Sequence, residues 1–289
     1  MHDQAEALRN MVNRRRDGSR VRTKIVTVTS GKGGVGKSNF TLNFALSLQA
    51  LGYRTLVFDA DIGLANIDVL MGVTPKFNLY HLLKKQKTIW EIIHKGMGGV
   101  LFIAGGSGFN DLVRMSEEEL EYFTGQISEL NGFVDYILFD TGAGLSKETL
   151  KFIVSAERTI VVTTPEPTAI TDAYAIIKMV HGMNYRVPYS LVVNRVRNEE
   201  EGRRTAEKIS LVARQFLKLD IPLLGCIEED QSVQKAVRKQ VPFTVAFPNC
   251  AASRSIRRLA SAFAEEKDAV RTEEAGVRMF LNKLLKLMR

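Results

Sequence analysis

The sequence is poor in cysteine and lacks any long apolar run. Cys226 and Cys250 are the only two cysteines and form no Cys-x-x-Cys pair. This excludes a disulfide framework, a structural zinc site and a cysteine-ligated cluster, and it predicts a reducing cytosol. No stretch of about 18 apolar residues occurs, so we expect no membrane-spanning helix. Residues 1–13 contain no apolar core segment and do not resemble a signal peptide.

Excess positive charge is scarce in the body of the chain and concentrated at its ends. The formal net charge is +8. Residues 1–22 hold six arginines and three acids, residues 275–289 hold four basic residues and no acid, and the remainder is nearly neutral. A basic body would indicate nucleic acid, whereas basic ends predict local docking on an anionic surface or partner.

The chain of 289 residues is long enough for one large α/β domain or two small ones. From residue 24 onward, short apolar runs rich in β-branched residues alternate with helical patterns. We expect strands at 24–29, 55–59, 100–104, 136–140, 159–163, 189–194 and 223–227, and helices at 38–51, 117–130, 168–181 and 199–219. This alternation predicts a doubly wound, mostly parallel α/β sheet in one domain, with ligands beyond the carboxyl ends of the strands.

A phosphate-binding sequence follows the first expected strand. Gly31-Lys-Gly-Gly-Val-Gly36-Lys37-Ser38 matches G-x-x-x-x-G-K-[ST] and opens the next expected helix. Its glycines let successive N–H groups point at phosphate oxygens, and the helix N-terminus adds partial positive charge. Lys37 is expected to reach the β- and γ-phosphates, and Ser38 to hold Mg²⁺. The predicted nucleotide-binding residues here are Gly31, Gly33, Gly34, Val35, Gly36, Lys37, Ser38 and Asn39.

A second lysine, Lys32, lies inside this loop. Alone it is a solvated loop lysine, but Lys-Gly-Gly-Val-Gly-Lys-Ser resembles the deviant Walker A loop of the MinD/ParA ATPases, which are SIMIBI-class P-loop NTPases. The resemblance covers about residues 24–263 and implies an ATPase domain at 23–274 that uses ATP and Mg²⁺. It also implies that Lys32 crosses a homodimer interface and stabilises charge on the partner's phosphates during catalysis.

Three aspartates stand at the ends of two expected strands. The segment from Asp59 through Asp61 to Asn66 looks like the first switch of MinD-type ATPases. That resemblance implies that Asp61 positions or deprotonates the attacking water, and that Asp59 supports Mg²⁺ through water. Asp140 follows four apolar residues, as a Walker B carboxylate does, and is predicted to hold Mg²⁺ through its water shell. The glycines after it predict a movable loop that senses the γ-phosphate, with an ordinary strand-to-helix turn as the alternative.

Base recognition rests on two later strand ends. By position, Asn194 and Arg195 and the loop from Glu228 to Asp230 correspond to the segments that flank adenine in this family. The resemblance therefore implies Asn194, Arg195, Glu228 and Asp230 as nucleotide-binding residues. No Asn/Thr-Lys-x-Asp guanine signature occurs, which favours ATP over GTP.

Residues 275–289 are predicted to form a basic amphipathic helix. Its apolar residues recur at helical spacing and are the predicted membrane-binding set Val277, Phe280, Leu281, Leu284, Leu285 and Met288. Four cations each add roughly 1 kcal/mol near an anionic leaflet, and two copies in a dimer add avidity. A similar terminal helix is released on ATP binding in MinD. The alternative is a helix packed permanently on the core, or one that binds a protein.

The N-terminal extension, residues 1–22, carries Asp-Gln-Ala-x-x-Leu-Arg at Asp3, Gln4, Leu8 and Arg9. This resembles the activator motif of the FlhG family (FleN, YlxH), MinD-like regulators of flagellar number. The resemblance implies that these four residues stimulate the GTPase FlhF, which is of the signal-recognition-particle type. A solvated, partly helical tail is the alternative. Contacts with flagellar switch-complex proteins or a flagellar transcription activator are implied by resemblance alone.

We therefore expect a slow, dimerising ATPase, cytoplasmic and reversibly peripheral on the inner face of the cell membrane, that controls flagellar number and placement. One alternative is a ParA-type partitioning ATPase that binds nonspecific DNA through a surface including Arg254, Arg257 and Arg258. The nearly neutral body makes DNA the less favoured partner. Another alternative is an interaction module in which ATP only sets conformation.

Overall fold

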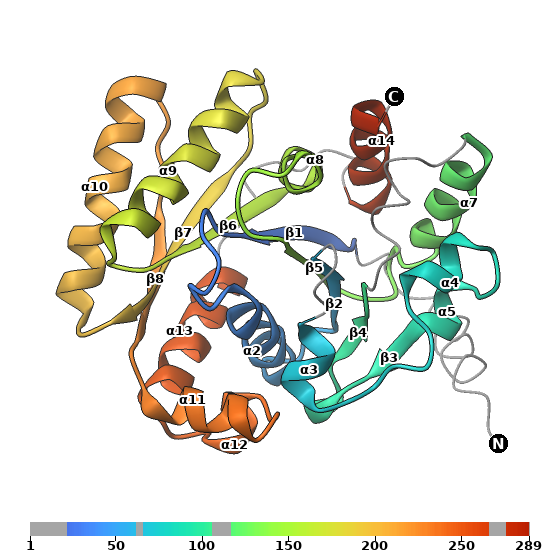
Figure 1. Cartoon of the computed structure of the whole chain (residues 1–289), viewed down its shortest axis with the longest axis horizontal. Helices are drawn as coiled ribbons and strands as arrows, with labels where there is room; N and C mark the ends of the chain where they lie inside the picture. The colour runs from blue at the N-terminus through green and yellow to red at the C-terminus, as the bar shows by residue number, and fades with distance from the viewer. Residues whose placement is uncertain (1–21, 62–65, 106–116, 266–275, 289) are drawn as a thin grey trace.

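The computed structural model describes residues 22–61, 66–105, 117–265 and 276–288. The predicted partner-activating residues Asp3, Gln4, Leu8 and Arg9 lie outside the described residues, as does the side chain of Met288. Figure 1 shows the sheet crossing the molecule, with helices packed on both of its sides.

The described residues form one sheet, with the strand order β3-β4-β2-β5-β1-β6-β7-β8. The strands are β1 (Lys24–Thr29), β2 (Thr55–Ala60), β3 (Ile93–Lys95), β4 (Leu101–Ile103), β5 (Tyr136–Thr141), β6 (Arg158–Thr163), β7 (Tyr189–Val196) and β8 (Leu223–Glu228). All neighbouring pairs are parallel except β3 with β4. The predicted doubly wound, mostly parallel α/β fold is confirmed.

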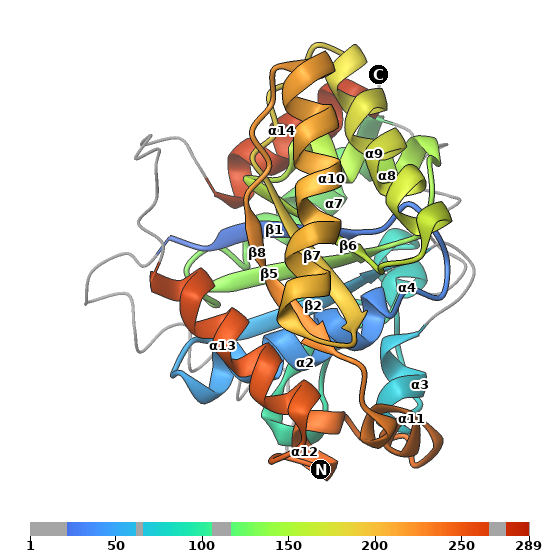
Figure 2. The same ribbon diagram turned by 90° about the vertical axis from the view of Figure 1, so that its left-hand side faces the viewer.

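One face of the sheet is covered by α2 (Lys37–Ala50), α3 (Ile67–Met71), α11 (Gln231–Arg238), α12 (Phe243–Ala246) and α13 (Ala251–Glu265). The other face is covered by α4 (Leu79–Leu83), α5 (Ile89–Ile92), α7 (Glu117–Ser128), α8 (Lys147–Ser155), α9 (Pro167–Gly182), α10 (Glu199–Leu217) and α14 (Val277–Met288). A short 3₁₀ helix, Met97–Gly99, precedes β4. Figure 2 shows α8, α9 and α14 above the sheet and α2 and α13 below it.

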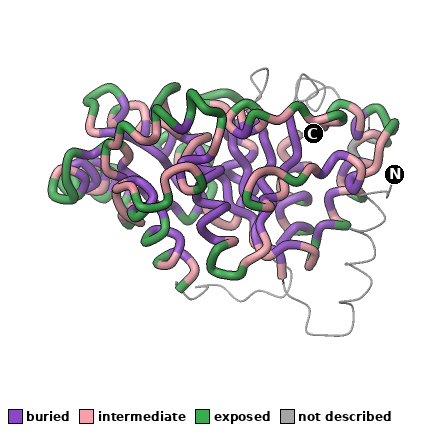
Figure 3. The backbone as a smooth tube through the Cα atoms, turned by 90° about the horizontal axis from the view of Figure 1, so that it is seen from below, coloured by how far each residue is buried: buried purple, intermediate pink, exposed green. Residues whose placement is uncertain are grey.

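The strands are apolar on both faces because both faces are covered. Along β5, Tyr136 and Leu138 belong to the core cluster under α2, while Ile137 and Phe139 belong to the cluster under α7 and α14. Figure 3 shows the resulting pattern, with buried segments through the middle and exposed segments at the rim. The carboxyl ends of β1, β2 and β5 meet at one edge, where Asp59 and Asp140 are register partners.

The C-terminal helix α14 packs on the sheet as part of the core. Val277, Phe280, Leu281 and Leu284 are all buried, and each such side chain contributes roughly 1.5–3 kcal/mol by leaving water. Leu285 is partly buried, and Arg278 and Lys286 are exposed. The apolar stripe that we predicted to bind a membrane thus faces the protein core, as the core-packing alternative predicts. Membrane binding stays a prediction, and it would require α14 to leave the sheet. Within the described segments, no helix combines the length and hydropathy needed to span a bilayer.

Candidate nucleotide site at the carboxyl edge of the sheet

The loop between β1 and α2 is shaped by glycine. Gly34 and Gly36 have positive φ angles of 81° and 93°, which side chains rarely tolerate. Gly31 lies against α9, where an added Cβ would come 2.1 Å from the carbonyl carbon of Asp172. α2 begins at Lys37 directly after this loop, so its unpaired N–H groups open toward the carboxyl edge of the sheet. This arrangement is suited to an anionic ligand such as a polyphosphate.

Lys37 forms a buried ion pair with Asp140. Its Nζ lies 2.9 Å from Asp140 Oδ1, which also accepts a hydrogen bond from Thr41 Oγ1 at 2.9 Å. The other oxygen, Asp140 Oδ2, is buried and has no hydrogen-bond partner among the described residues. Lys37 Nζ also donates to Ser38 Oγ at 3.3 Å. A free buried carboxylate oxygen close to a hydroxyl suits a Mg²⁺ ion held partly through water, so the predicted residues fit that ion.

Asp59 is fully buried and holds the segment that follows β2. Its Oδ1 accepts a hydrogen bond from the backbone N–H of Asp61, and its Oδ2 accepts from the N–H groups of Asn66 and Ile67. Burial, together with the nearby Asp140 carboxylate, raises the pKa of Asp59 to about 7. Asp59 therefore acts here as a cap for the segment around Asp61. Its predicted support of Mg²⁺ through water stays a prediction.

The raised pKa of Asp59 predicts that stability falls as pH rises. The folded protein keeps the Asp59 proton until about pH 7, whereas the unfolded chain loses it near the ordinary value of 3.8. Rising pH between these values therefore favours the unfolded chain, by about 4 kcal/mol in all. Urea titrations at pH 4.5, 6 and 8 should show this loss, and Asp59→Asn should be less stable at acid pH but have a flatter pH profile. If the free energy of unfolding changed equally with pH in the wild type and in Asp59→Asn, the prediction would be wrong.

Asp61 faces the loop after β5. Its Oδ2 accepts a hydrogen bond from Asn66 Nδ2 at 3.0 Å, and its Oδ1 would lie 3.3 Å from a Cβ added at Gly142. Burial raises the pKa of Asp61 above its ordinary value, with Lys37 acting to lower it and Asp140 to raise it. A half-buried carboxylate near the phosphate loop is suited to accept a proton from water.

The side chain of Lys32 contacts the start of α9. Its Nζ lies 3.2 Å from Glu166 Oε2 and 2.9 Å from Thr168 Oγ1, at the start of α9. The Lys32 and Glu166 side chains are 41% and 59% exposed, so solvent weakens this pair and little holds Lys32 in place. The lysine is thus available at the surface, as a residue that reaches a second subunit must be.

The residues predicted to flank adenine have structural contacts here. Asn194 Nδ2 donates to the carbonyl of Val35 at 2.8 Å and lies where a Cβ of Gly36 would be, so Asn194 supports the phosphate loop. Arg195 has a positive φ of 56° and is exposed. Asp230 caps α11 through the N–H of Ser232 and also accepts from the N–H at Ala252, near the start of α13. Burial acts to raise the pKa of Asp230, but these hydrogen bonds lower it overall.

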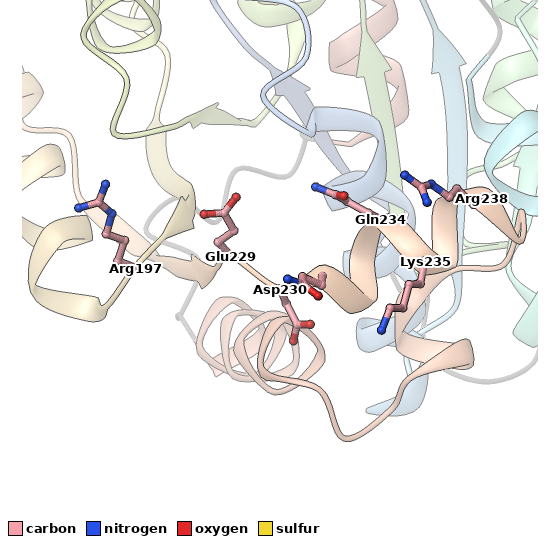
Figure 4. Close-up of a pocket in the computed structure, with 7 residues that line it drawn as sticks. Arg197, Glu229, Asp230, Gln234, Lys235 and Arg238 are labelled. Carbon is pink, nitrogen blue, oxygen red and sulfur yellow. The ribbon is translucent and has the colours of Figure 1, made fainter.

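A polar cavity of about 640 Å³ lies beside these residues. It is lined by Arg197 after β7, Glu229 and Asp230 after β8, and by Gln231, Gln234, Lys235 and Arg238 of α11 (Figure 4). It adjoins the end of β7 because Glu229 N–H donates to the carbonyl of Val196. Glu228 is the last residue of β8 and is partly buried. A volume of this size admits a nucleoside.

The structure brings together Lys37, Ser38, Asp59, Asp61 and Asp140 at one edge of the sheet, and their predicted roles stay predictions. Sequence reasoning missed three supporting residues: Thr41, Glu166 and Thr168. It also missed the cavity residues Arg197, Gln234, Lys235 and Arg238. Thr41 lies one turn after Lys37 on α2, so its helical spacing was a usable signal. No sequence pattern indicates that Lys32 contacts Glu166 and Thr168, which lie more than 130 positions further along the chain.

The parallel sheet, the glycine loop before α2 and the buried Lys37–Asp140 pair define a P-loop nucleotide-binding protein. Residues 26–243 match the model of the CobQ/CobB/MinD/ParA nucleotide-binding domain. The chain therefore belongs to the MinD/ParA nucleotide-binding family.

Three relatives place the chain within this family. The flagellum site-determining protein YlxH of Helicobacter pylori is 38% identical, with all of both chains covered. The antiactivator FleN of Pseudomonas aeruginosa is 35% identical over 84% of this chain and 87% of its own. Among solved structures, the septum site-determining protein MinD of Pyrococcus horikoshii, complexed with Mg-ADP, is 25% identical, with a TM-score of 0.69 over 84% of this chain and 96% of that one.

Proposed function

We propose that this protein is an ATP-dependent switch that dimerises around ATP, hydrolyses it slowly and regulates flagellar number and placement. One observation carries the ATPase part: Lys37, Asp140 and Asp61 converge at the glycine loop, with one buried oxygen of Asp140 unpartnered. The P. horikoshii relative is a complex with Mg-ADP, which supports Mg²⁺ and an adenine nucleotide as ligands.

In this mechanism, Lys37 leaves Asp140 to bind the β- and γ-phosphates. Asp140 Oδ1 keeps its hydrogen bond from Thr41, and the unpartnered Oδ2 would help to hold Mg²⁺ through water. Mg²⁺, when bound, neutralises charge on the phosphates. Asp61 orients the attacking water and accepts its proton, while Asp59 and Asn66 hold Asp61 in place. Lys32 leaves Glu166 and reaches the phosphates of the partner subunit, where it stabilises charge that develops during phosphoryl transfer.

The flagellar role is carried over from the relatives. YlxH is named as flagellum site-determining and FleN as an antiactivator, and the YlxH match includes both ends of this chain. We propose that residues 1–22, through Asp3, Gln4, Leu8 and Arg9, stimulate an FlhF-type GTPase. Regulated placement then needs a membrane cue, which we assign to α14.

The DNA-binding alternative gains no support from α13. Arg254 donates to the carbonyl of Asn249, Arg257 to that of Pro248, and Arg258 to Ser255 Oγ. These arginines are engaged locally, although their remaining N–H groups are free to contact an anion. DNA therefore stays the second candidate, and the membrane experiment below separates the two.

Co-flotation with anionic liposomes tests the proposal. The Asp61→Ala variant, which should bind ATP without hydrolysing it, is expected to float with ATP and to stay in solution with ADP, because dimerisation presents two copies of α14. Deleting residues 276–289 should abolish flotation. The Lys37→Ala variant, which lacks the phosphate-binding lysine, is the control that should not respond to ATP.

Absence of flotation in both nucleotide states would remove the membrane part of the proposal. ATP-dependent binding to duplex DNA that weakens steeply with salt would then favour the partitioning alternative.

A further inference from the structure

Three aromatic rings connect the nucleotide edge of the sheet to α14. Phe139 of β5, immediately before Asp140, stacks on Phe280 of α14 with ring centroids 4.8 Å apart. Phe152 of α8 lies 5.1 Å from Phe139 and 6.2 Å from Phe280. All three are buried, at 5% exposure or less. The residue beside the predicted metal ligand therefore forms part of the surface that holds α14.

The helix α8 is also tied directly to the loop after β5. Thr149 Oγ1 donates to the carbonyl of Gly142 at 3.3 Å, and Ser146 caps the helix by accepting from Thr149 N–H. At the other end of the loop, Gly144 N–H donates to the carbonyl of Ser30, the residue before the phosphate loop. A displacement of this loop would therefore be transmitted at one end to the phosphate loop and at the other to α8.

The helices α8 and α14 pack against each other along much of their lengths. Leu284 of α14 belongs to the cluster that contains Phe152, and Leu287, closer to the end of α14, packs against the cluster that contains Leu150 and Ile153. Tightly packed cores have discrete arrangements and do not deform continuously. A small shift of α8 must then either carry α14 with it or break the contact between them.

We propose that α8 is the lever that couples the nucleotide site to the release of α14, and that Phe152 is the residue that positions α14. Ligand contact with the loop at residues 142–145 pulls α8 through Thr149, which separates Phe152 from Phe280 and frees α14. This inference rests on the proposed ATP-dependent switch and supplies its mechanical route. Neither Thr149 nor Phe152 contacts the nucleotide in this route.

The two residues should have opposite effects, which amide hydrogen exchange of α14 can measure in lipid-free protein. In the wild type, exchange should rise at least about tenfold when a non-hydrolysable ATP analogue replaces ADP. Phe152→Leu should show the fast exchange already with ADP. Thr149→Val, which keeps the shape but removes the hydrogen bond to Gly142, should show slow exchange with both nucleotides while its affinity for the analogue is unchanged.

Phe102→Leu is the matched control, because Phe102 is equally buried but lies in the core cluster on the opposite face of the sheet. It should lose stability as Phe152→Leu does and keep the nucleotide response of the wild type. The lever alone would be overturned if Phe152→Leu and Thr149→Val both kept the nucleotide response of the wild type. It would also be overturned if Phe102→Leu lost that response. If the hydrogen exchange of α14 in the wild type were the same with the ATP analogue and with ADP, both the proposed switch and the lever would be overturned.

Discussion

Replacing Lys32 by alanine is expected to lower ATP hydrolysis by about 10³-fold or more, because a cation supplied from a second subunit contributes on this scale in related phosphoryl transfers. ATP binding to the monomer should change little, since the Lys32 side chain is paired with Glu166 and Thr168. The fold should also be unaffected, because an exposed ion pair contributes only about 0–1 kcal/mol. Steady-state turnover, nucleotide affinity and urea titration measure these three effects. Light scattering with ATP measures dimer formation, which the variant should lose.

Lys85→Ala is a suitable control for this variant. Lys85 is 40% exposed and paired with Glu118, so its surroundings are close to those of Lys32 with Glu166, but it lies far along the chain from the phosphate loop. It should hydrolyse ATP and dimerise normally. A Lys32→Ala protein that still forms an ATP-dependent dimer and turns over at the wild-type rate would refute the role in the partner subunit.

Replacing Asp61 by asparagine is expected to lower turnover by about 10²–10⁴-fold, the usual contribution of a positioned general base. The shape and the contact with Asn66 are retained, so ATP affinity and stability should stay close to those of the wild type. The dimer should accumulate because hydrolysis no longer returns it to monomers. Turnover, ATP affinity and light scattering over time measure these effects.

The wild-type pH profile is a second readout for Asp61. The base must be deprotonated, and burial raises its pKa above the ordinary value of 3.8, so turnover should fall on the acid side at a higher pH than for an exposed aspartate. This acid limb should disappear in the Asp61→Asn residual activity. If the variant retains both the limb and near-normal turnover, another group activates the water.

The sheet was predictable because its inner strands are covered on both faces and read as apolar runs. Six of the expected strands differ from the observed ones by at most two residues at an end, and β1 matches throughout. The strand β3 was missed because three residues are too few to show a hydropathy pattern. Its antiparallel pairing with β4 depends on tertiary packing, which the local sequence does not indicate. The helix α8 was missed because it is short and follows a glycine-rich loop.

The chemistry of the site was predictable where it rests on local spacing, and its contacts were not. The phosphate loop and the aspartates at the strand ends are sequence patterns, so Lys37 and Asp140 could be named. That they pair with each other depends on β1 and β5 being neighbours in the sheet. The capping role of Asp230 could have been predicted, because aspartate is a common N-cap residue at the start of a helix. The resemblance to the family led us to predict a contact with adenine instead.

The burial of α14 has a consequence for handling the protein. The proposed release of α14 would uncover Phe280, Leu281 and Leu284 of the helix, together with Phe139 and Phe152 beneath them. Most ligands stabilise the protein they bind, but under this proposal ATP binding would also expose apolar surface, which favours aggregation. ATP should therefore make the lipid-free protein less soluble, and vesicles should act as its solubilising partner.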